Sequence, residues 1–275
     1  MASAARQRSL IVPREHGAWG ILLIPLLTGG CVGFLAAGSA RNFAPLGIAA
    51  LSLFWLRTPV ESWAGTTPVR VRTAGEMKLV RNAVLILAAV SIGALIWLFW
   101  GGRNRALLGI GAIAGTSFLI QAILKRAWQK ARTVAQMIGA AGLTSMAPAA
   151  YYVATGQWDG NAWSLWAANL LFAVNQIHFV QLRIHAAQIK TAREKLLAGR
   201  WFLAGQFISI AMLASACALH LFRWYAAAAF LPILFRGSAW FAATPQPLAI
   251  HTLGKSELLY ACAFGVLLVL GIRLR

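Results

Sequence analysis

The chain of 275 residues is 60% hydrophobic and only 11% charged. A water-soluble domain of this length needs far more polar surface, so the composition excludes a soluble globular protein and predicts a protein embedded in lipid. The net charge of +19 does not indicate nucleic-acid binding, because the cations are interleaved with long apolar runs rather than gathered on one polar face. We therefore predict membrane lipids, and no nucleic acid, as partners.

The first element is a run of apolar residues at 17–38, which has about the length of a membrane-spanning helix. Arg14, Glu15 and His16 directly precede it, so they mark a point where membrane meets water. Residues 13–29, which read PREHGAWGILLIPLLTG, resemble the opening of the YwiC-like family of bacterial membrane proteins. The resemblance implies a bacterial cytoplasmic (inner) membrane protein and points to no particular reaction.

Further apolar runs follow along the chain, and only helices satisfy backbone hydrogen bonds within such continuous runs. We therefore predict an all-α, polytopic bundle that forms a single transmembrane domain over residues 1–275. The run at 43–56 is short, and the eighth run contains Pro232 and Arg236, so a count of eight or ten stays open beside nine. The predicted spans are residues 17–38, 43–56, 82–100, 106–124, 135–154, 161–182, 201–222, 224–241 and 257–273.

The Lys and Arg residues are distributed unequally between the connections that join the predicted spans. Most of the 25 fall before the first span and in the connections after spans two, four and six, which are long, whereas the alternate connections are short. Because Lys and Arg are enriched in cytoplasmic loops, this bias predicts a cytoplasmic N-terminus and an external C-terminus.

Nine spans with basic loops after spans two and six are similar to the UbiA-type intramembrane prenyltransferase superfamily. Residues 72–73 (Arg-Thr), 125–126 (Lys-Arg) and 175–178 (Asn-Gln-Ile-His) resemble parts of its motifs. The resemblance implies a bundle around a cytoplasmic cavity that takes an isoprenoid diphosphate. The aspartates that hold Mg²⁺ in that superfamily are missing, since the second-motif positions fall near Phe179 and Arg183. We therefore predict no metal site and no cofactor, and we assign no catalytic residue.

The candidate ligand-binding residues are the polar and basic side chains expected at the cytoplasmic ends of the spans. Cations there bind anionic headgroups, and bidentate Arg contacts suit phosphate or carboxylate. Asn175 and His178 share one helix face. The alternative is that the cations serve only orientation and lipid contact, and that the polar residues bond between helices. The candidates are Arg14, Glu15, His16, Arg57, Glu61, Arg72, Lys125, Arg126, Asn175, His178 and Arg183.

The leading hypothesis is binding or processing of an isoprenoid or other amphipathic anion in a basic cytoplasmic cavity. It predicts that Arg57, Glu61, Asn175 and His178 face one cavity. A small-solute transporter is the alternative, although the halves of the chain show none of the internal similarity common among transporters. A non-catalytic membrane accessory protein is the third hypothesis, and it needs no cavity.

Overall fold

The computed structural model describes residues 2–13, 16–37, 39–40, 42–65, 70–100, 105–127, 132–189, 191–244 and 248–273. Within these ranges every regular element is a helix, which confirms the predicted all-α, polytopic fold. The helices are α1 (Ala2–Ile11), α2 (His16–Ala37), α3 (Phe43–Trp63), α4 (Ala74–Trp100), α5 (Arg105–Ala127), α6 (Arg132–Thr144), α7 (Met146–Thr155), α8 (Gly160–His185), α9 (Ala192–Ala218), α10 (Trp224–Ala227), η2 (Ala228–Phe230), α11 (Leu231–Ala242) and α12 (Ile250–Arg273).

Seven segments of the described chain are helical, long and apolar enough to cross a membrane, so the chain is an integral, multi-pass membrane protein. They comprise α2, α3, α4, α5, α9, the α10–α11 segment and α12. The other two predicted spans, 135–154 and 161–182, correspond to the pair α6–α7 and to α8. The predicted count of nine stays a prediction.

Two prolines explain where predicted spans are interrupted. The span at 135–154 is divided at Ser145 into α6 and α7. Pro148 lacks the N–H that would bond to the carbonyl of Thr144, so one backbone hydrogen bond of the helix is missing at this point. In the same way Pro232 follows the three-residue η2, in which the chain tightens into a 3₁₀ turn before α11 begins.

The connections after the second and sixth predicted spans are shorter than the sequence predicted. Helix α3 continues to Trp63 and α4 begins at Ala74, so residues 64–73 alone connect them. Helix α8 continues to His185 and α9 begins at Ala192. Polar residues at these helix ends lowered the apolar signal without ending the helices, because backbone hydrogen bonding does not require apolar side chains. Most of the predicted loop residues therefore extend the spans as helix.

The helices form two compact units, one of residues Met1–His16 and Ser39–Arg105 and one of Gly17–Gly38 and Ala106–Arg275. The first contains α1, α3 and α4, and the second contains the remaining helices. The single transmembrane domain stays a prediction beside this division.

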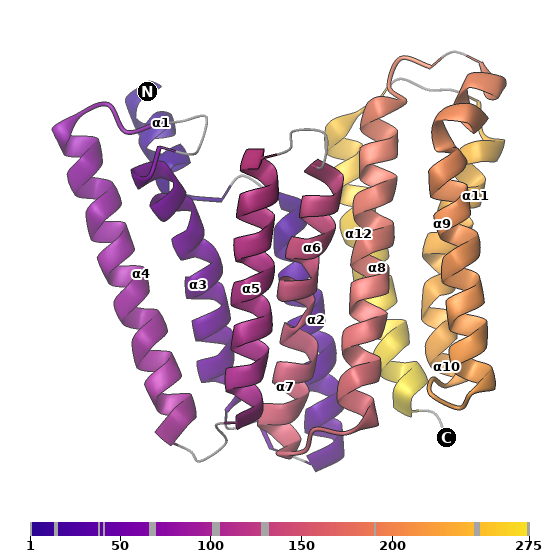
Figure 1. The fold of residues 1–275 in the computed structure, drawn as a ribbon, viewed down its shortest axis with the longest axis horizontal. Helices are drawn as coiled ribbons and strands as arrows, with labels where there is room; N and C mark the ends of the chain where they lie inside the picture. The colour runs from indigo at the N-terminus through magenta and orange to yellow at the C-terminus, as the bar shows by residue number, and fades with distance from the viewer. Residues whose placement is uncertain are drawn as a thin grey trace. The chain divides into compact units, whose positions relative to one another are not determined.

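In the first unit, α3 and α4 run side by side along their length (Figure 1). The hydroxyl oxygens of Ser52 and Ser91 lie 2.9 Å apart at their contact. Helix α1 packs on the same pair: Leu10 is fully buried, and the indole N–H of Trp55 donates to the carbonyl of Ile11 at 2.9 Å. The Ser62 hydroxyl donates to the carbonyl of Leu10 at 3.1 Å, so α3 satisfies two carbonyls at the end of α1.

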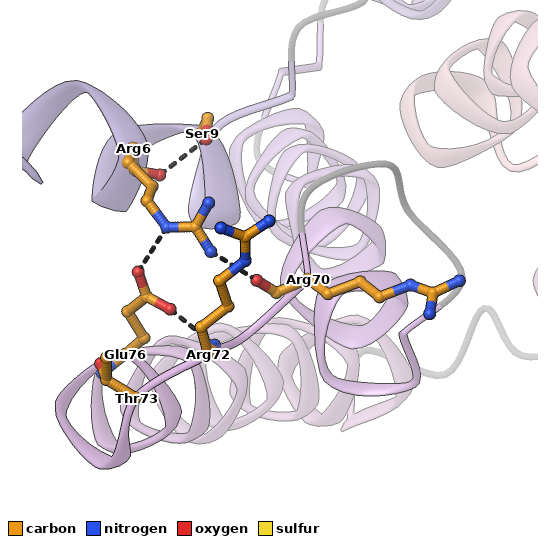
Figure 2. A network of polar contacts seen from close by, with 6 residues as sticks. All are labelled: Arg6, Ser9, Arg70, Arg72, Thr73 and Glu76. Atoms are coloured by element: carbon orange, nitrogen blue, oxygen red, sulfur yellow. Dashed lines mark hydrogen bonds and ion pairs between the residues drawn. The ribbon is translucent and has the colours of Figure 1, made fainter. Parts of the chain in front are cut away.

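A polar network joins α1 to the start of α4, and Figure 2 shows its members. The Nε–H of Arg6 donates to Oε1 of Glu76 at 2.7 Å, and an Nη2–H of Arg6 donates to the carbonyl of Arg70 at 2.8 Å. The backbone N–H of Arg72 donates to Oε2 of Glu76 at 2.7 Å. Glu76 lies in the first turn of α4, where a carboxylate also favours the positive end of the helix.

The core of the second unit is built from aromatic and small side chains. The rings of Phe172 on α8 and Phe264 on α12 are stacked with centroids 4.2 Å apart, and both are buried. A Cβ on Gly29 would collide with the backbone of Ala147, so α2 and α7 approach more closely than larger residues allow. This packing holds α8 and α12 together in the core of the second unit.

Candidate functional site

One pocket of the second unit lies between the end of α8, the start of α9, the end of α11 and the segment that precedes α12. The empty space there is about 290 Å³ when open solvent is counted, and the enclosed part has room for about one water molecule. Two of its seven lining residues are basic and five are apolar, and most of the surface that they expose to the pocket is polar. The lining residues, which define the basic pocket, are Arg183, Ala186, Ala187, Ile189, Lys195, Trp240 and Leu248.

Lys195 is the more rigidly held of the two cations. It is buried, with 3% of its surface exposed, and its Nζ donates to the carbonyl of Ala243 at 2.6 Å. The same Nζ lies 4.5 Å from the ring centroid of Trp240. Ala243 is the C-cap of α11, so the ammonium group satisfies a carbonyl at the negative end of that helix. An ammonium group has three donors, and the bond to Ala243 uses one of them.

Arg183 lies in the last turn of α8. The N-cap of this helix, at its other end, is Asp159. The carboxylate of Asp159 accepts hydrogen bonds from the N–H groups of Asn161 at 2.9 Å and Ala162 at 3.2 Å, and so sets the start of the helix. Arg183 is half-buried. Phe179 and Asn175 lie one and two turns before it, on the same face of α8, which leads from the pocket into the bundle.

An aromatic cluster of Phe179, Phe202, Trp240 and Phe241 lies between the basic pocket and the interior. The ring centroids of Phe179 and Phe202 are 5.4 Å apart, and those of Phe179 and Trp240 are 6.4 Å apart. Phe241 completes the cluster with its centroid 4.7 Å from that of Trp240. A Cβ on Gly199 would collide with the ring of Phe241. Glycine at this position therefore allows the ring to pack directly on the backbone of α9.

A pair of opposite charges lies next to Phe179 of the aromatic cluster. Arg236 on α11 and Glu257 on α12 form an ion pair, and their side chains are only 5% and 7% exposed. An Nη2–H of Arg236 also donates to Oδ1 of Asn175 at 3.0 Å, and Nε2 of Gln176 donates to the carbonyl of Glu257 at 3.1 Å. The guanidinium carbon of Arg236 lies 4.1 Å from the ring centroid of Phe179. Helices α8, α11 and α12 are therefore joined at one polar point.

Gln206 on α9 approaches the same part of α11 at Gly237. A Cβ on Gly237 would lie 2.7 Å from Nε2 of Gln206 and 3.0 Å from the ring of Phe202, so only glycine admits both side chains here. Gln206 therefore contacts α11 at the residue that follows Arg236. The buried polar cluster, as we call it, consists of Asn175, Gln176, Gln206, Arg236 and Glu257.

The structure places three of the predicted site residues around these two features. Arg183 lines the basic pocket, and Asn175 belongs to the buried polar cluster. His178 is half-buried at the edge of the aromatic cluster, with its ring centroid 5.4 Å from that of Phe202. The polar face of α8 predicted from sequence therefore does lie against other helices of the second unit.

Other predicted residues lie in the first unit or at the surface. The Nε–H of Arg57 donates to Oε1 of Glu61, one turn along α3, at 2.8 Å, and Arg72 lies in the segment before α4. Arg126 is exposed near the end of α5. The convergence of Arg57 and Glu61 with Asn175 and His178 on one cavity stays a prediction, because the two pairs belong to different units.

Four predicted positions fall outside what the structure describes. Arg14 and Glu15 lie outside the described residues, and the same holds for the side chains of His16 and Lys125.

Sequence reasoning missed Lys195, Trp240, Arg236 and Glu257 as members of a site. Arg236 was considered only in connection with the number of spans, and Glu257 was not among the candidate residues. A signal was present, because charged residues inside membrane spans usually pair with each other, and here a single Arg and a single Glu occupy neighbouring spans. Lys195 and Trp240 carry no comparable signal, since they meet only in the folded chain.

Comparison with known families gives one match. The family model described as YwiC-like protein matches residues 12–151, which extend from the end of α1 into α7. No curated protein and no solved structure matches the chain. The basic pocket and the buried polar cluster are built by residues that follow the matched segment.

Proposed function

The chain belongs to the YwiC-like protein family, and from this premise we propose that it is a protein of the bacterial cytoplasmic membrane that binds an amphipathic anion in the basic pocket. The observation that carries the proposal is the presence of two cations and an apolar wall in one pocket of a multi-pass membrane protein. The proposed ligand class is an isoprenoid or similar lipid with a phosphate or carboxylate head.

The cations of the pocket supply the recognition of the charged head. Arg183 offers a planar guanidinium that can contact two oxygens at once, and Lys195 offers a compact charge that Ala243 holds in place. Hydrogen bonds between charged groups are shorter and stronger than neutral ones. We therefore expect a head of single or double negative charge to contact both side chains without a metal ion.

The apolar wall supplies the contact for the tail. Trp240, Leu248 and Ile189 lie in the same lining as the two cations. An indole ring offers a large apolar face, and burial of a hydrocarbon tail against it adds affinity in proportion to the area removed from water. A free phosphate lacks this contribution, so the pocket favours a lipid over an inorganic anion.

The predicted orientation agrees with a ligand that enters from the inner leaflet. The pocket lies where α8 ends and α9 begins, a connection that the distribution of Lys and Arg assigns to the cytoplasm. Arg193 and Arg200 lie on α9 close to the same end, and the inner leaflet carries anionic lipid that such residues attract.

The proposal is tested by binding to the full chain in lipid nanodiscs. The ligands are a long-chain isoprenyl monophosphate and the matching neutral isoprenol. We expect the phosphate to bind and Arg183→Gln to weaken it about tenfold or more, since a hydrogen bond to a charged group contributes about 1.5–3 kcal/mol. Arg193→Gln is the matched control, because this exposed cation lies close by on α9 and is not part of the lining.

Two results would overturn the proposal. One is equal affinity for the isoprenol and its phosphate, which would mean that the cations do not recognise the head. The other is an equal effect of Arg183→Gln and Arg193→Gln, which would mean that any cation at this membrane surface contributes in the same way.

A further inference from the structure

The buried polar cluster contains polar atoms that no described residue satisfies. Five buried side-chain atoms lack a hydrogen-bond partner within the described chain, and all five belong to this cluster. They are Oε1 of Gln176, Nε2 and Oε1 of Gln206, Nε of Arg236 and Oε1 of Glu257. Native proteins rarely leave such atoms unpaired, because each forfeits its hydration without compensation. Three of them belong to residues joined by the ion pair and its hydrogen bonds, and the other two belong to Gln206, which contacts the same helix, α11, at Gly237. Unpaired atoms grouped on neighbouring residues in this way point to a bound partner.

The charges around these atoms define what that partner is. Arg236 and Glu257 neutralise each other through their ion pair, so the cluster has no net charge to offer. An anion there would face the free Oε1 of Glu257, and a cation would face the Nε–H of Arg236. A neutral molecule meets neither repulsion.

The unpaired hydrogen-bonding groups also limit which neutral molecules the cluster can bind. Nε of Arg236 and Nε2 of Gln206 are donors, whereas the three free oxygens are acceptors. A molecule that both donates and accepts hydrogen bonds can satisfy atoms of both kinds. Buried water does this in many proteins, typically with about three hydrogen bonds each.

We propose that the buried polar cluster binds a small neutral molecule that donates and accepts hydrogen bonds, either water or a small solute of the same chemistry. Gln176 and Gln206 contact it from α8 and α9, and Arg236 and Glu257 from α11 and α12. The site differs from the basic pocket in charge and in ligand, so it does not depend on the proposed binding of an amphipathic anion.

The aromatic cluster separates this site from the basic pocket. Phe179 contacts both, since its ring centroid lies 4.1 Å from Cζ of Arg236 and 6.4 Å from the ring centroid of Trp240. Phe179 is only 2% exposed. Phe179 is therefore a natural reporter for a molecule bound beside the guanidinium.

Radiolytic hydroxyl labelling of the full chain in nanodiscs tests the proposal, because radicals formed from bound water modify the side chains next to it. We expect Phe179 to be labelled severalfold more than Phe172 and Phe264, which are buried in an apolar core. In Gln206→Leu, which removes two of the five unpaired atoms, labelling of Phe179 should fall to the level of those two controls.

A solute arm distinguishes water from another neutral ligand. Labelling of Phe179 is compared with that of the exposed Trp201 in the presence and absence of acetamide. A specific fall at Phe179 identifies a solute that displaces water, and an unchanged ratio identifies water as the occupant.

Thermal unfolding of Gln206→Leu gives a second test, because the Tm should change in opposite directions with and without a bound molecule. If a molecule is bound, the substitution removes its hydrogen bonds and lowers the Tm. If the atoms are dry, the substitution removes two unpaired polar atoms from an apolar interior and raises the Tm. A raised Tm, labelling of Phe179 no greater than that of Phe264, or labelling unchanged in Gln206→Leu would each overturn the proposal.

Discussion

Arg236 on α11 and Glu257 on α12 pair with each other at a place where both side chains are more than nine-tenths buried. Transfer of either charge alone from water to such a place is strongly unfavourable, and the pair persists because each side chain has the other. The bond from Arg236 to Asn175 adds α8 to the same point. This relationship ties three helices together and defines the inner boundary of the region in which we place the site.

Removal of one member of this pair should destabilise the protein far more than removal of both. We expect Glu257→Met or Arg236→Met alone to lower the free energy of unfolding by about 3–5 kcal/mol, because the residue that remains is a buried charge without its partner. The double variant Arg236→Met with Glu257→Met should cost less than the sum. Thermal unfolding in detergent of all four proteins measures the coupling, and additive losses would show that the two residues do not act as a pair.

Gly237→Ala should destabilise the contact between α9 and α11. The new Cβ would lie 2.7 Å from Nε2 of Gln206, and such overpacking costs about 1–3 kcal/mol. Gly254→Ala on α12 is the matched control, because nothing lies within 4 Å of its new Cβ and alanine favours a helix by about 0.5–1 kcal/mol over glycine. The two variants should therefore shift the Tm in opposite directions, and a shift of the same sign would contradict the described approach of Gln206 to Gly237.

Lys195→Met should loosen the end of α11. The substitution keeps the apolar stem of the side chain but removes the hydrogen bond to Ala243 and the charge above Trp240. Hydrogen–deuterium exchange of residues 239–244 should accelerate. Lys255→Met, a change of the same kind at an exposed position on α12, should leave that exchange unaltered. Equal exchange in both variants would mean that Lys195 does not stabilise the helix end.

Arg6→Gln should release α1 from the start of α4. The guanidinium of Arg6 contacts both Glu76 and the carbonyl of Arg70, as Figure 2 shows, and glutamine carries no charge for the first contact. Limited proteolysis should then cut within residues 2–13 faster than in the unaltered protein. Arg8→Gln removes an exposed cation of the same helix and should not change the rate.

The sequence was a good guide to the helices and a poor guide to where they end. Apolar runs identified the described helices from α2 onward, because a lipid-facing helix needs apolar side chains along most of its length. Glu76 and Lys195 instead lie within the first turns of α4 and α9, where charged side chains reach water or a helix end and do not interrupt the backbone. Run length therefore underestimates helices whose ends are polar.

The site shows the same difference between local and tertiary information. Asn175 and His178 could be selected from α8 alone, because helical spacing shows which residues share a face. The partners of that face, Arg236 and Glu257, lie on two other helices, and sequence spacing does not show which helices meet. The pocket depends further on Lys195 reaching the end of α11, a contact between residues 48 positions apart.

The most direct test of the proposed ligand site is photo-crosslinking with an isoprenyl monophosphate that carries a diazirine near its phosphate end. The full chain is labelled in nanodiscs, and the crosslinked residues are identified by mass spectrometry with and without excess unlabelled isoprenyl monophosphate. The account predicts competed crosslinks at Ile189, Trp240 and Leu248, the apolar lining of the basic pocket. Competed crosslinks confined to α3 and α4, or crosslinks that excess ligand does not compete, would contradict it.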